Sequence, residues 1–386
     1  MRLITADYIF NGEGFFQNAL LVLNDDGSVK DFLSVADHTQ LESAEKFNGT
    51  LCPGFVNSHC HLELSHMIGK VTPGKGFAKF ATELIPQRNW ISPEQIAEVC
   101  AEADAEMYAG GIQAVGDISN VDFSFATKSK SKIAYHTFIE LLGLNPAVAQ
   151  KMFEDGKKLK AITPNAKSLS PHAPYSVSSE LLQTIAREEE ITSGVVTIHN
   201  QESLAESEFT ERGTGSVLEI FNMFGLDLSF YKPSGKNSLH TVLPDLRGTF
   251  NLLLVHNTFS SSADIQWAHA QQEHLYWCLC PNANLYIENS LPDVMMMRDN
   301  NCRIVIGTDS LASNYQLNIL EELKVLHKNF PKIPVAELLT WATKNGAEAL
   351  KMENIGTFEI GKKPGVVLLE GVSPETIYMT ARSARV

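Results

Sequence analysis

The sequence predicts an α/β fold, a (β/α)₈ TIM barrel with a small composite β-sandwich annex built from both chain ends. Eight short apolar runs alternate with helix-like stretches, which is the rhythm of repeated βα units. Histidine or acidic residues follow several of these runs, and a barrel gathers the ends of its strands on one face. A doubly wound open sheet has the same alternation, although it usually has fewer strands.

The annex is predicted from turn-bounded runs at the two ends of the chain. Residues 20–23 suit a strand, and Asn24-Asp25-Asp26-Gly27 suits the turn that follows it. Residues 365–369 and 376–380 suit two further strands. We therefore expect an annex of residues 1–51 and 350–386 around a barrel of residues 52–349.

The barrel is predicted from the middle of the chain. Each of its eight apolar runs is short enough for a buried strand. A capping-box pattern of Ser92 and Gln95, with Pro93 at the first helical position, marks one helix start. Helices are expected at 93–108, 178–190, 263–272 and 317–327. Strands are expected at 53–57, 112–115, 133–139, 167–169, 195–198, 252–255, 276–279 and 304–306.

Two connections are longer than a βα unit requires. Residues 62–91 follow the first barrel strand, and residues 223–249 separate the fifth from the sixth. Loops of this length inside a compact domain are usually lids or binding loops.

The composition restricts the partners. Lysine and arginine number 31 against 45 acidic residues, a net charge of −14, and no dense basic cluster offers a face for nucleic acid or anionic membrane. With 44% hydrophobic and 20% charged residues, the chain is a folded globule. No apolar run reaches the roughly 20 residues of a membrane helix, and the start lacks a signal-peptide pattern. The six cysteines form no Cys-x-x-Cys pair, which indicates reduced thiols and a cytoplasmic protein.

Chemically active residues cluster at the predicted strand ends. His59 and His61 close the first strand, and residues two apart on a strand point to the same side, so both imidazoles can hold one ion. A lone His-x-His is weak evidence, because buried histidines are common. The further candidates at strand ends are His172, His199, His256 and Asp309. Three imidazoles and one carboxylate suit Zn²⁺ or Fe²⁺ with a position left for water.

Several motifs together resemble the amidohydrolase superfamily. They are His59-Cys60-His61, His199 with Glu202 three residues later, His256, and Gly307-Thr308-Asp309-Ser310. More narrowly, the chain resembles the aminohydrolase branch of cytosine deaminase and chlorohydrolase-like metal-dependent hydrolases. The resemblance covers nearly the whole chain, and it is less specific about the substrate than about the superfamily.

The resemblance implies a metal site of four ligands. His59, His61, His199 and Asp309 would bind one divalent metal, with zinc as the first expectation and iron as the second. A bound metal lowers the pKa of water from about 15.7 toward about 7, which supplies hydroxide at neutral pH. Many relatives hold two metals bridged by a modified lysine late in the fourth strand. Here Lys167 lies at the start of that strand, so one metal is expected.

The resemblance also implies catalytic roles. Glu202 would carry protons to the ring nitrogen and the departing amine, because deamination needs both. His256 would orient the attacking water, and His172 would touch the substrate. Asp309 would be both a metal ligand and a catalytic residue. Without the motif, Glu202 would be taken for a solvated carboxylate at a helix start.

Four further residues near the strand ends have less certain roles. Glu63 and His66 are candidates for substrate binding, and bonds that brace the first loop are an equal alternative. Asp117 and Glu140 are expected to support the site or the fold rather than to take part in catalysis.

The sequence therefore predicts a hydrolase acting on C–N bonds other than peptide bonds. It would deaminate an amino-substituted heterocycle, such as a purine nucleoside or an adenosine derivative, by metal-hydroxide attack with release of ammonia. Hydrolysis of a cyclic amide or a C–Cl bond is the enzyme alternative. A barrel that binds a ligand without turnover is the alternative from another class, and retention of Glu202 and His256 argues against it. The expected partner is a small-molecule substrate, and a homodimer is left open.

Overall fold

The computed structural model describes residues 1–192 and 194–386, and all eight expected barrel strands are present in it. They form two four-stranded parallel sheets. The first has the order β6 (Phe55–Cys60), β7 (Ile112–Ser119), β8 (Ala134–Leu141) and β9 (Ala166–Pro171). The second has the order β10 (Val195–Asn200), β11 (Asn251–His256), β12 (Leu275–Leu279) and β13 (Ile304–Ile306).

The two parallel sheets contact each other on both sides. Cys60 and Asp309 form a parallel bridge between the ends of β6 and the segment after β13. On the other side, His199 N donates to His172 O at 2.9 Å, which joins β10 to the end of β9. These contacts bring strand ends from distant parts of the chain together.

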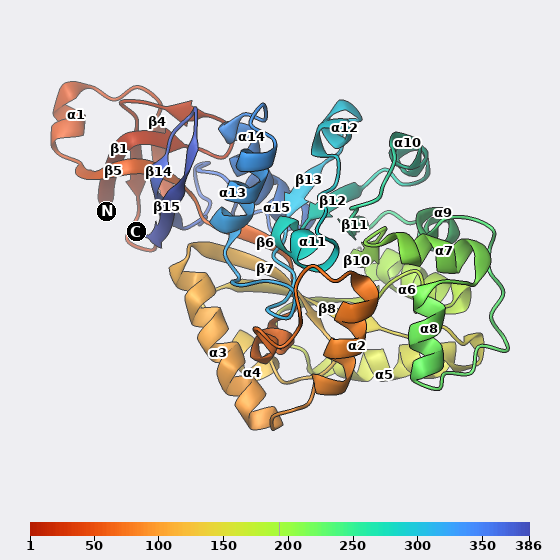
Figure 1. The fold of residues 1–386 in the computed structure, drawn as a ribbon. Coiled ribbons are helices and arrows are strands. Elements are labelled where there is room, and N and C mark those ends of the chain that lie inside the picture. Colours follow the sequence, from red (N-terminus) through yellow and green to blue (C-terminus); the bar gives the residue numbers. More distant parts are fainter. Residues whose placement is uncertain (193) are drawn as a thin grey trace.

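Helices surround the parallel sheets (Figure 1). The expected helix at 93–108 is α3, Pro93–Ala109, and Ser92 and Gln95 form both bonds of the capping box. The expected segments at 178–190, 263–272 and 317–327 are α6 (Ser179–Thr192), α10 (Ser262–Gln271) and α13 (Ile319–Asn329). The others after the first barrel strand are α2 (Phe77–Gln87), α4 (Phe125–Lys128), α5 (Ala149–Ile162), α7 (Leu204–Arg212), α8 (Ser216–Met223), α9 (Ser238–Val242), α11 (Pro281–Glu288), α12 (Val294–Asp299), α14 (Val335–Ala342) and α15 (Lys344–Ala349).

Side-chain alternation along the strands separates two apolar layers. Phe55 packs in the large cluster shared with the helices, and its neighbour Val56 packs in a second cluster with Phe138 and Leu253. Cys60 belongs to the first cluster, so it lies on the opposite side of β6 from its neighbours His59 and His61.

Strands from both chain ends pair in one seven-stranded sheet, seen in red and blue in Figure 1. A β-sandwich was expected here, whereas the strands from the two chain ends are hydrogen-bonded to one another within one continuous sheet. Its order is β15 (Ile377–Arg385), β14 (Val366–Val372), β5 (Glu45–Pro53), β1 (Arg2–Phe10), β3 (Leu20–Leu23) and β4 (Val29–Leu33), with β2 (Phe15–Phe16) paired to β1. The short helix α1 (His38–Glu42) lies between β4 and β5.

The end sheet leads directly into the first parallel strand. The expected strand at 53–57 is split there, because β5 ends at Pro53 and β6 begins at Phe55. Gly54 lies between them, where a Cβ atom would come within 2.6 Å of both Gln113 Cβ and Pro364 O. Only glycine fits this close approach.

The long connections contain short helices. Residues 62–91 hold a 3₁₀ helix over Leu62–Met67 and then α2. Residues 223–249 hold α9 and a 3₁₀ turn over Leu243–Asp245. Among the described residues, no helix combines the length and apolarity needed to cross a membrane.

Candidate metal and catalytic site

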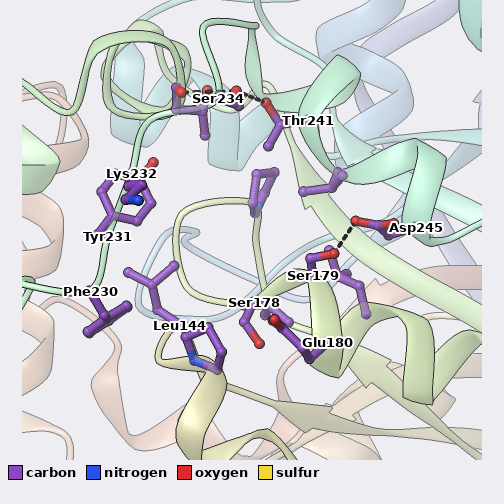
Figure 2. A pocket seen from close by; sticks show the side chains of 16 residues that line it. Leu144, Ser178, Ser179, Glu180, Phe230, Tyr231, Lys232, Ser234, Thr241 and Asp245 are labelled. Atoms are coloured by element: carbon purple, nitrogen blue, oxygen red, sulfur yellow. Dashed lines mark hydrogen bonds between the residues drawn. The ribbon is translucent and has the colours of Figure 1, made fainter.

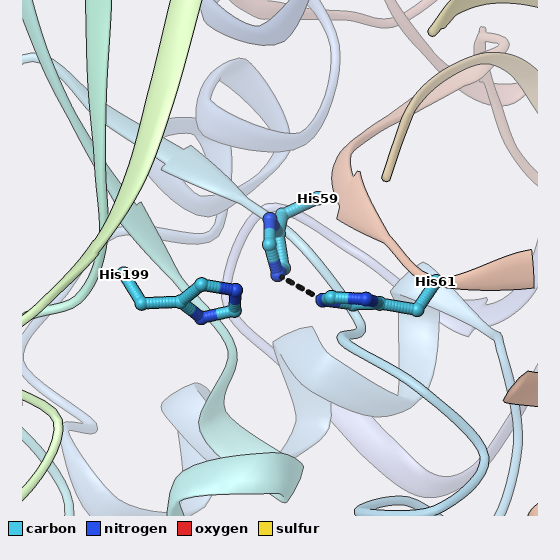
Figure 3. A group of neighbouring side chains, drawn as sticks. All are labelled: His59, His61 and His199. Carbon is cyan, nitrogen blue, oxygen red and sulfur yellow. Dashed lines mark hydrogen bonds between the residues drawn. The ribbon is translucent and has the colours of Figure 1, made fainter. Parts of the chain in front are cut away.

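Three imidazoles face one another at the carboxyl ends of the parallel strands (Figure 3). His59 comes from β6, His61 follows that strand directly, and His199 comes from β10. All three are buried, and their candidate ligand nitrogens lie within 4.8 Å of one another. Asp309 and His256 complete a second such group with His59.

The distances between donor atoms fit a metal ion. His59 Nε2 and His61 Nε2 are 3.2 Å apart, and Asp309 Oδ1 lies 3.5 and 3.4 Å from them. Ligands 2.0–2.1 Å from a tetrahedral zinc ion would be about 3.3 Å apart. Donors of these three side chains are therefore spaced as adjacent ligands of one ion.

The charge states also suit metal binding. Burial lowers the pKa of His59 to about 4 and lowers that of His61 well below its usual value, so both imidazoles are neutral. Burial alone would raise the pKa of Asp309, but hydrogen bonding to His59 and electrostatic interactions with His61 and His256 hold it well below its usual range. Neutral imidazole and ionised carboxylate are the forms that bind metal.

His199 has the opposite shift. Burial lowers its pKa, but the carboxylates of Glu140, Glu202 and Asp309 outweigh burial and raise the pKa to about 9. Without a metal, this imidazole is therefore protonated at neutral pH, and a metal would replace that proton.

Glu202 and His256 lie together beside the cluster. Glu202 Oε1 is 3.7 Å from His256 Nε2, and the same nitrogen is 3.1 Å from His199 Nδ1. His256 Nδ1 lies 3.0 Å from Asn284 Oδ1, which accepts hydrogen bonds only. This contact assigns the proton of the imidazole to Nδ1, so Nε2 is an acceptor that faces His199 and the site.

Left-handed backbone turns occur at three of the strand ends. Gln201, His256 and Asp309 have φ angles of 44°, 74° and 58°. Non-glycine residues are strained in the left-handed region of φ/ψ space, and such residues concentrate at functional sites. Asn200 Nδ2 donates to Asn257 Oδ1 at 2.9 Å, which links the turns at Gln201 and His256.

The loop that carries Glu202 is tied to helix α7. Glu206 is fully buried and accepts the backbone N–H groups of Gln201 at 2.7 Å and Glu202 at 3.3 Å. Burial raises its pKa to about 7, although hydrogen bonds oppose the shift. Glu206 thereby fixes the backbone that positions Glu202.

His172 and Glu140 lie on the other side of His199. His172 follows β9 and Glu140 is on β8, and ligand atoms of all three lie within 4.8 Å of one another. Burial lowers the pKa of His172 to about 4. Burial opposes ionisation of Glu140, but His172 and His199 lower its pKa below the usual range. The site therefore contains a neutral imidazole and a carboxylate next to the cluster.

Glu63 and His66 lie outside the cluster and brace the first loop. Glu63 pairs with Arg88 and accepts the backbone N–H of Asn120 at 3.1 Å, while His66 Nε2 lies 2.8 Å from Arg88 O. Burial raises the pKa of Glu63 to about 7 against the effect of Arg88. These residues line a cavity of about 500 Å³ with Phe123. Substrate contact by Glu63 and His66 stays a prediction.

Asp117 and Lys167 make contacts that support the fold. Asp117 pairs with Lys128, and both side chains are completely buried. Asp117 Oδ1 also accepts the N–H of Leu62, the residue after His61. Lys167 Nζ donates to Thr163 O at 2.6 Å, at the start of β9 and away from the strand end.

The second long connection borders another cavity, of about 280 Å³ (Figure 2). Tyr231 and Ser234 line one side, and Ser179 lines the other at the start of α6. Ser179 Oγ donates to Asp245 Oδ2 at 2.6 Å, on the right of the view. The histidines of the cluster do not line this cavity.

Sequence reasoning missed Arg88, Asn120 and Glu206. Arg88 and Asn120 lie in connections without a motif, and no pattern linked them to Glu63. Glu206 could have been found, because Ser203-x-x-Glu206 has the spacing of a helix-capping pair. Its carboxylate instead reaches back to Gln201 and Glu202, although Ser203 does cap α7.

With this site at the ends of parallel strands, the chain belongs to the amidohydrolase family, whose profile matches residues 50–385. An aminodeoxyfutalosine deaminase from Nitratiruptor sp. is 30% identical over 337 residues, 84% of this chain and 79% of that protein. An adenosine deaminase from Helicobacter pylori is 27% identical over 364 residues, 89% of this chain and 86% of that one. The crystal structure of Helicobacter pylori aminofutalosine deaminase with methylthio-coformycin shares the fold, with a TM-score of 0.82 at 21% identity over 97% of this chain and 94% of that one.

Proposed function

We propose that this chain is a metal-dependent aminohydrolase that deaminates an adenosine-like nucleoside and releases ammonia. The contact between Glu202 and His256 beside the three-histidine cluster carries the proposal, because it places a proton carrier next to a candidate metal site. The deaminase relatives support hydrolysis of a C–N bond in a nucleoside.

The donor set favours one zinc ion held by His59, His61, His199 and Asp309. When bound, the metal would acidify a water molecule so that it can attack at neutral pH. A single ion is proposed because Lys167, the candidate bridging lysine, points its amine to Thr163. Iron has the same ligand preferences and is the alternative.

The chain's own residues would then move protons and orient the reactants. Glu202 accepts a proton from the attacking water and donates it to the ring nitrogen as the carbon becomes tetrahedral. It then takes the remaining proton from the hydroxyl group on that carbon and passes it to the departing amine as the carbonyl forms. His256, held through Nδ1 by Asn284, keeps Nε2 toward the water and orients it by accepting a hydrogen bond from it. Burial of all these groups strengthens their electrostatic effects.

The architecture proposed for this function is a closed (β/α)₈ barrel of residues 52–349 with an annex of residues 1–51 and 350–386. The contacts between Cys60 and Asp309 and between His199 and His172 support closure of the barrel. A cytoplasmic location is proposed from the six cysteines, all of which are free thiols.

Ammonia release tests the function. The zinc-loaded protein is assayed with adenosine, 5′-deoxyadenosine, 5′-methylthioadenosine, aminodeoxyfutalosine, cytosine and an aminotriazine. We expect ammonia from at least one adenosine-like nucleoside, and a loss of about 10²- to 10⁴-fold in kcat for Glu202→Gln with its zinc retained. Release of chloride from a chlorotriazine, or opening of a cyclic amide, without any deamination would instead identify the alternative hydrolase.

A further inference from the structure

Glu140 has one carboxylate oxygen to which the described residues offer no hydrogen bond. Oε2 accepts from Asn120 Nδ2 at 2.9 Å. Oε1 makes no hydrogen bond. Its neighbour His199 Nε2 lies 3.4 Å away, an ion-pair distance, and the histidine loses its charge when a metal replaces its proton. The residue is only 6% exposed. A buried carboxylate oxygen without a donor costs free energy, so Oε1 is suited to accept a hydrogen bond from a ligand.

His172 offers a second acceptor beside it. The Ser176 hydroxyl donates to Ala173 O at 3.1 Å, and its oxygen lies 2.7 Å from His172 Nδ1. When the serine proton is directed to Ala173 O, His172 donates from Nδ1 to the serine oxygen. Its Nε2 is then a bare acceptor.

His199 separates this pair from the catalytic residues. Its Nδ1 faces His256, next to Glu202, and its Nε2 faces Glu140. The reacting carbon and its amine belong on the side of Glu202, because that carboxylate must reach both. The side of Glu140 and His172 therefore meets a part of the substrate that does not react.

We propose that Glu140 and His172 bind the sugar hydroxyls of the nucleoside, which deepens the proposed deaminase function and rests on it. A candidate ligand atom of Glu140 lies within 4.8 Å of one of His172, so the two side chains are close enough to meet two O–H donors on adjacent carbons. Asn120, which holds Glu140, also lines the 500 Å³ cavity with Arg88.

Substrate analogues test this pairing on the unaltered enzyme. The kcat/KM values of the zinc-loaded protein are compared for an adenosine-type ribonucleoside and its 2′,3′-dideoxy counterpart. The dideoxy compound lacks the hydroxyl groups that would donate to the charged Glu140, so its kcat/KM should be about 10- to 100-fold lower. Equal values for the two nucleosides would overturn the proposal. If no nucleoside is deaminated, the proposed function fails, and calorimetric binding of the same two compounds still tests the acceptor pair.

The Glu140→Gln variant tests the residue itself. We expect kcat/KM for the ribonucleoside to fall about 10- to 100-fold, while the value for the dideoxy compound changes less than about 3-fold. The matched control is Glu180→Gln, which removes one negative charge from an exposed position on α6. Zinc per chain is measured for all proteins. An equal loss for both nucleosides, accompanied by loss of zinc, would show that Glu140 binds the metal and would overturn the assignment.

Discussion

Glu206 Oε1 accepts the backbone N–H of Gln201 at 2.7 Å, immediately before the proposed proton carrier Glu202. The other oxygen of Glu206 lies 3.3 Å from the N–H of Glu202 itself. A side chain on helix α7 thus holds the turn by its backbone and leaves the Glu202 carboxylate free to face His256. Correct placement of Glu202 depends on a residue that need not touch the substrate.

Replacing Glu206 should reduce turnover without removing the metal. Glu206→Ala leaves two N–H groups unpaired, and we expect kcat to fall about 10- to 100-fold, because small displacements of a catalytic group are costly. Glu206→Gln keeps one acceptor and should lose less. Ser203→Ala is the control, because it removes the cap of α7 at a cost of about 1 kcal/mol and leaves the carboxylate in place. Steady-state kinetics and zinc analysis distinguish the variants, and a full loss of zinc in Glu206→Ala would contradict this role.

Zinc binding should release about one proton per chain near pH 7. His59 and His61 are already neutral there, whereas the pKa of His199 is raised to about 9 in the metal-free chain. Zinc must displace the proton of His199, so its apparent affinity should rise about tenfold per pH unit below pH 9. Calorimetry in two buffers with different ionisation enthalpies counts the proton. No proton release at pH 7 would show that His199 is neutral or is not a ligand.

Most of the fold could be predicted from local pattern. The parallel strands contain short segments rich in apolar residues, so all eight were visible, and the capping box at Ser92 marked the start of α3 correctly. The single end sheet was not predicted, because β5 and β14 pair Cys52 with Val367 across more than 300 residues. Local sequence carries no information on that register.

The site could be predicted only in part, for a similar reason. His59, His199 and His256 lie at the carboxyl ends of strands and Asp309 follows one, and a parallel arrangement brings such positions together. Asn120 lies in a connection, and its contact with Glu140 depends on the path of the loop after β7. The roles of all these residues remain predictions from the motif and the geometry.

Glu322 should make stability depend on pH. It is fully buried and accepts from Asn282 N and Asn314 Nδ2, yet burial raises its pKa from 4.5 to about 7. Between those pH values the folded chain holds a proton that the unfolded chain lacks. This contribution is complete below pH 4.5 and is lost as the pH rises through about 7, by up to about 3 kcal/mol. Urea unfolding of wild type and Glu322→Gln from pH 4.5 to 8 should show a flatter profile for the variant, and parallel profiles would count against it.

Lys128 and Asp117 form a buried ion pair, so the effects of replacing them on the free energy of unfolding should be strongly coupled. Both side chains are completely buried, and Asp117 also accepts the N–H of Leu62, beside His61. Lys128→Met leaves a buried carboxylate without its counter-charge, so the free energy of unfolding should fall by about 3–5 kcal/mol. Because the pKa of Asp117 is already raised by burial and would rise further without Lys128, the loss should be smaller at pH 5 than at pH 8.

The double variant Asp117→Asn, Lys128→Met keeps an acceptor for Leu62 without burying a charge, and it should recover much of the loss. Urea unfolding of the wild type, both single variants and the double variant measures the coupling. Additive losses would mean that the two side chains act independently, whereas recovery would show that Lys128 is needed chiefly to neutralise Asp117.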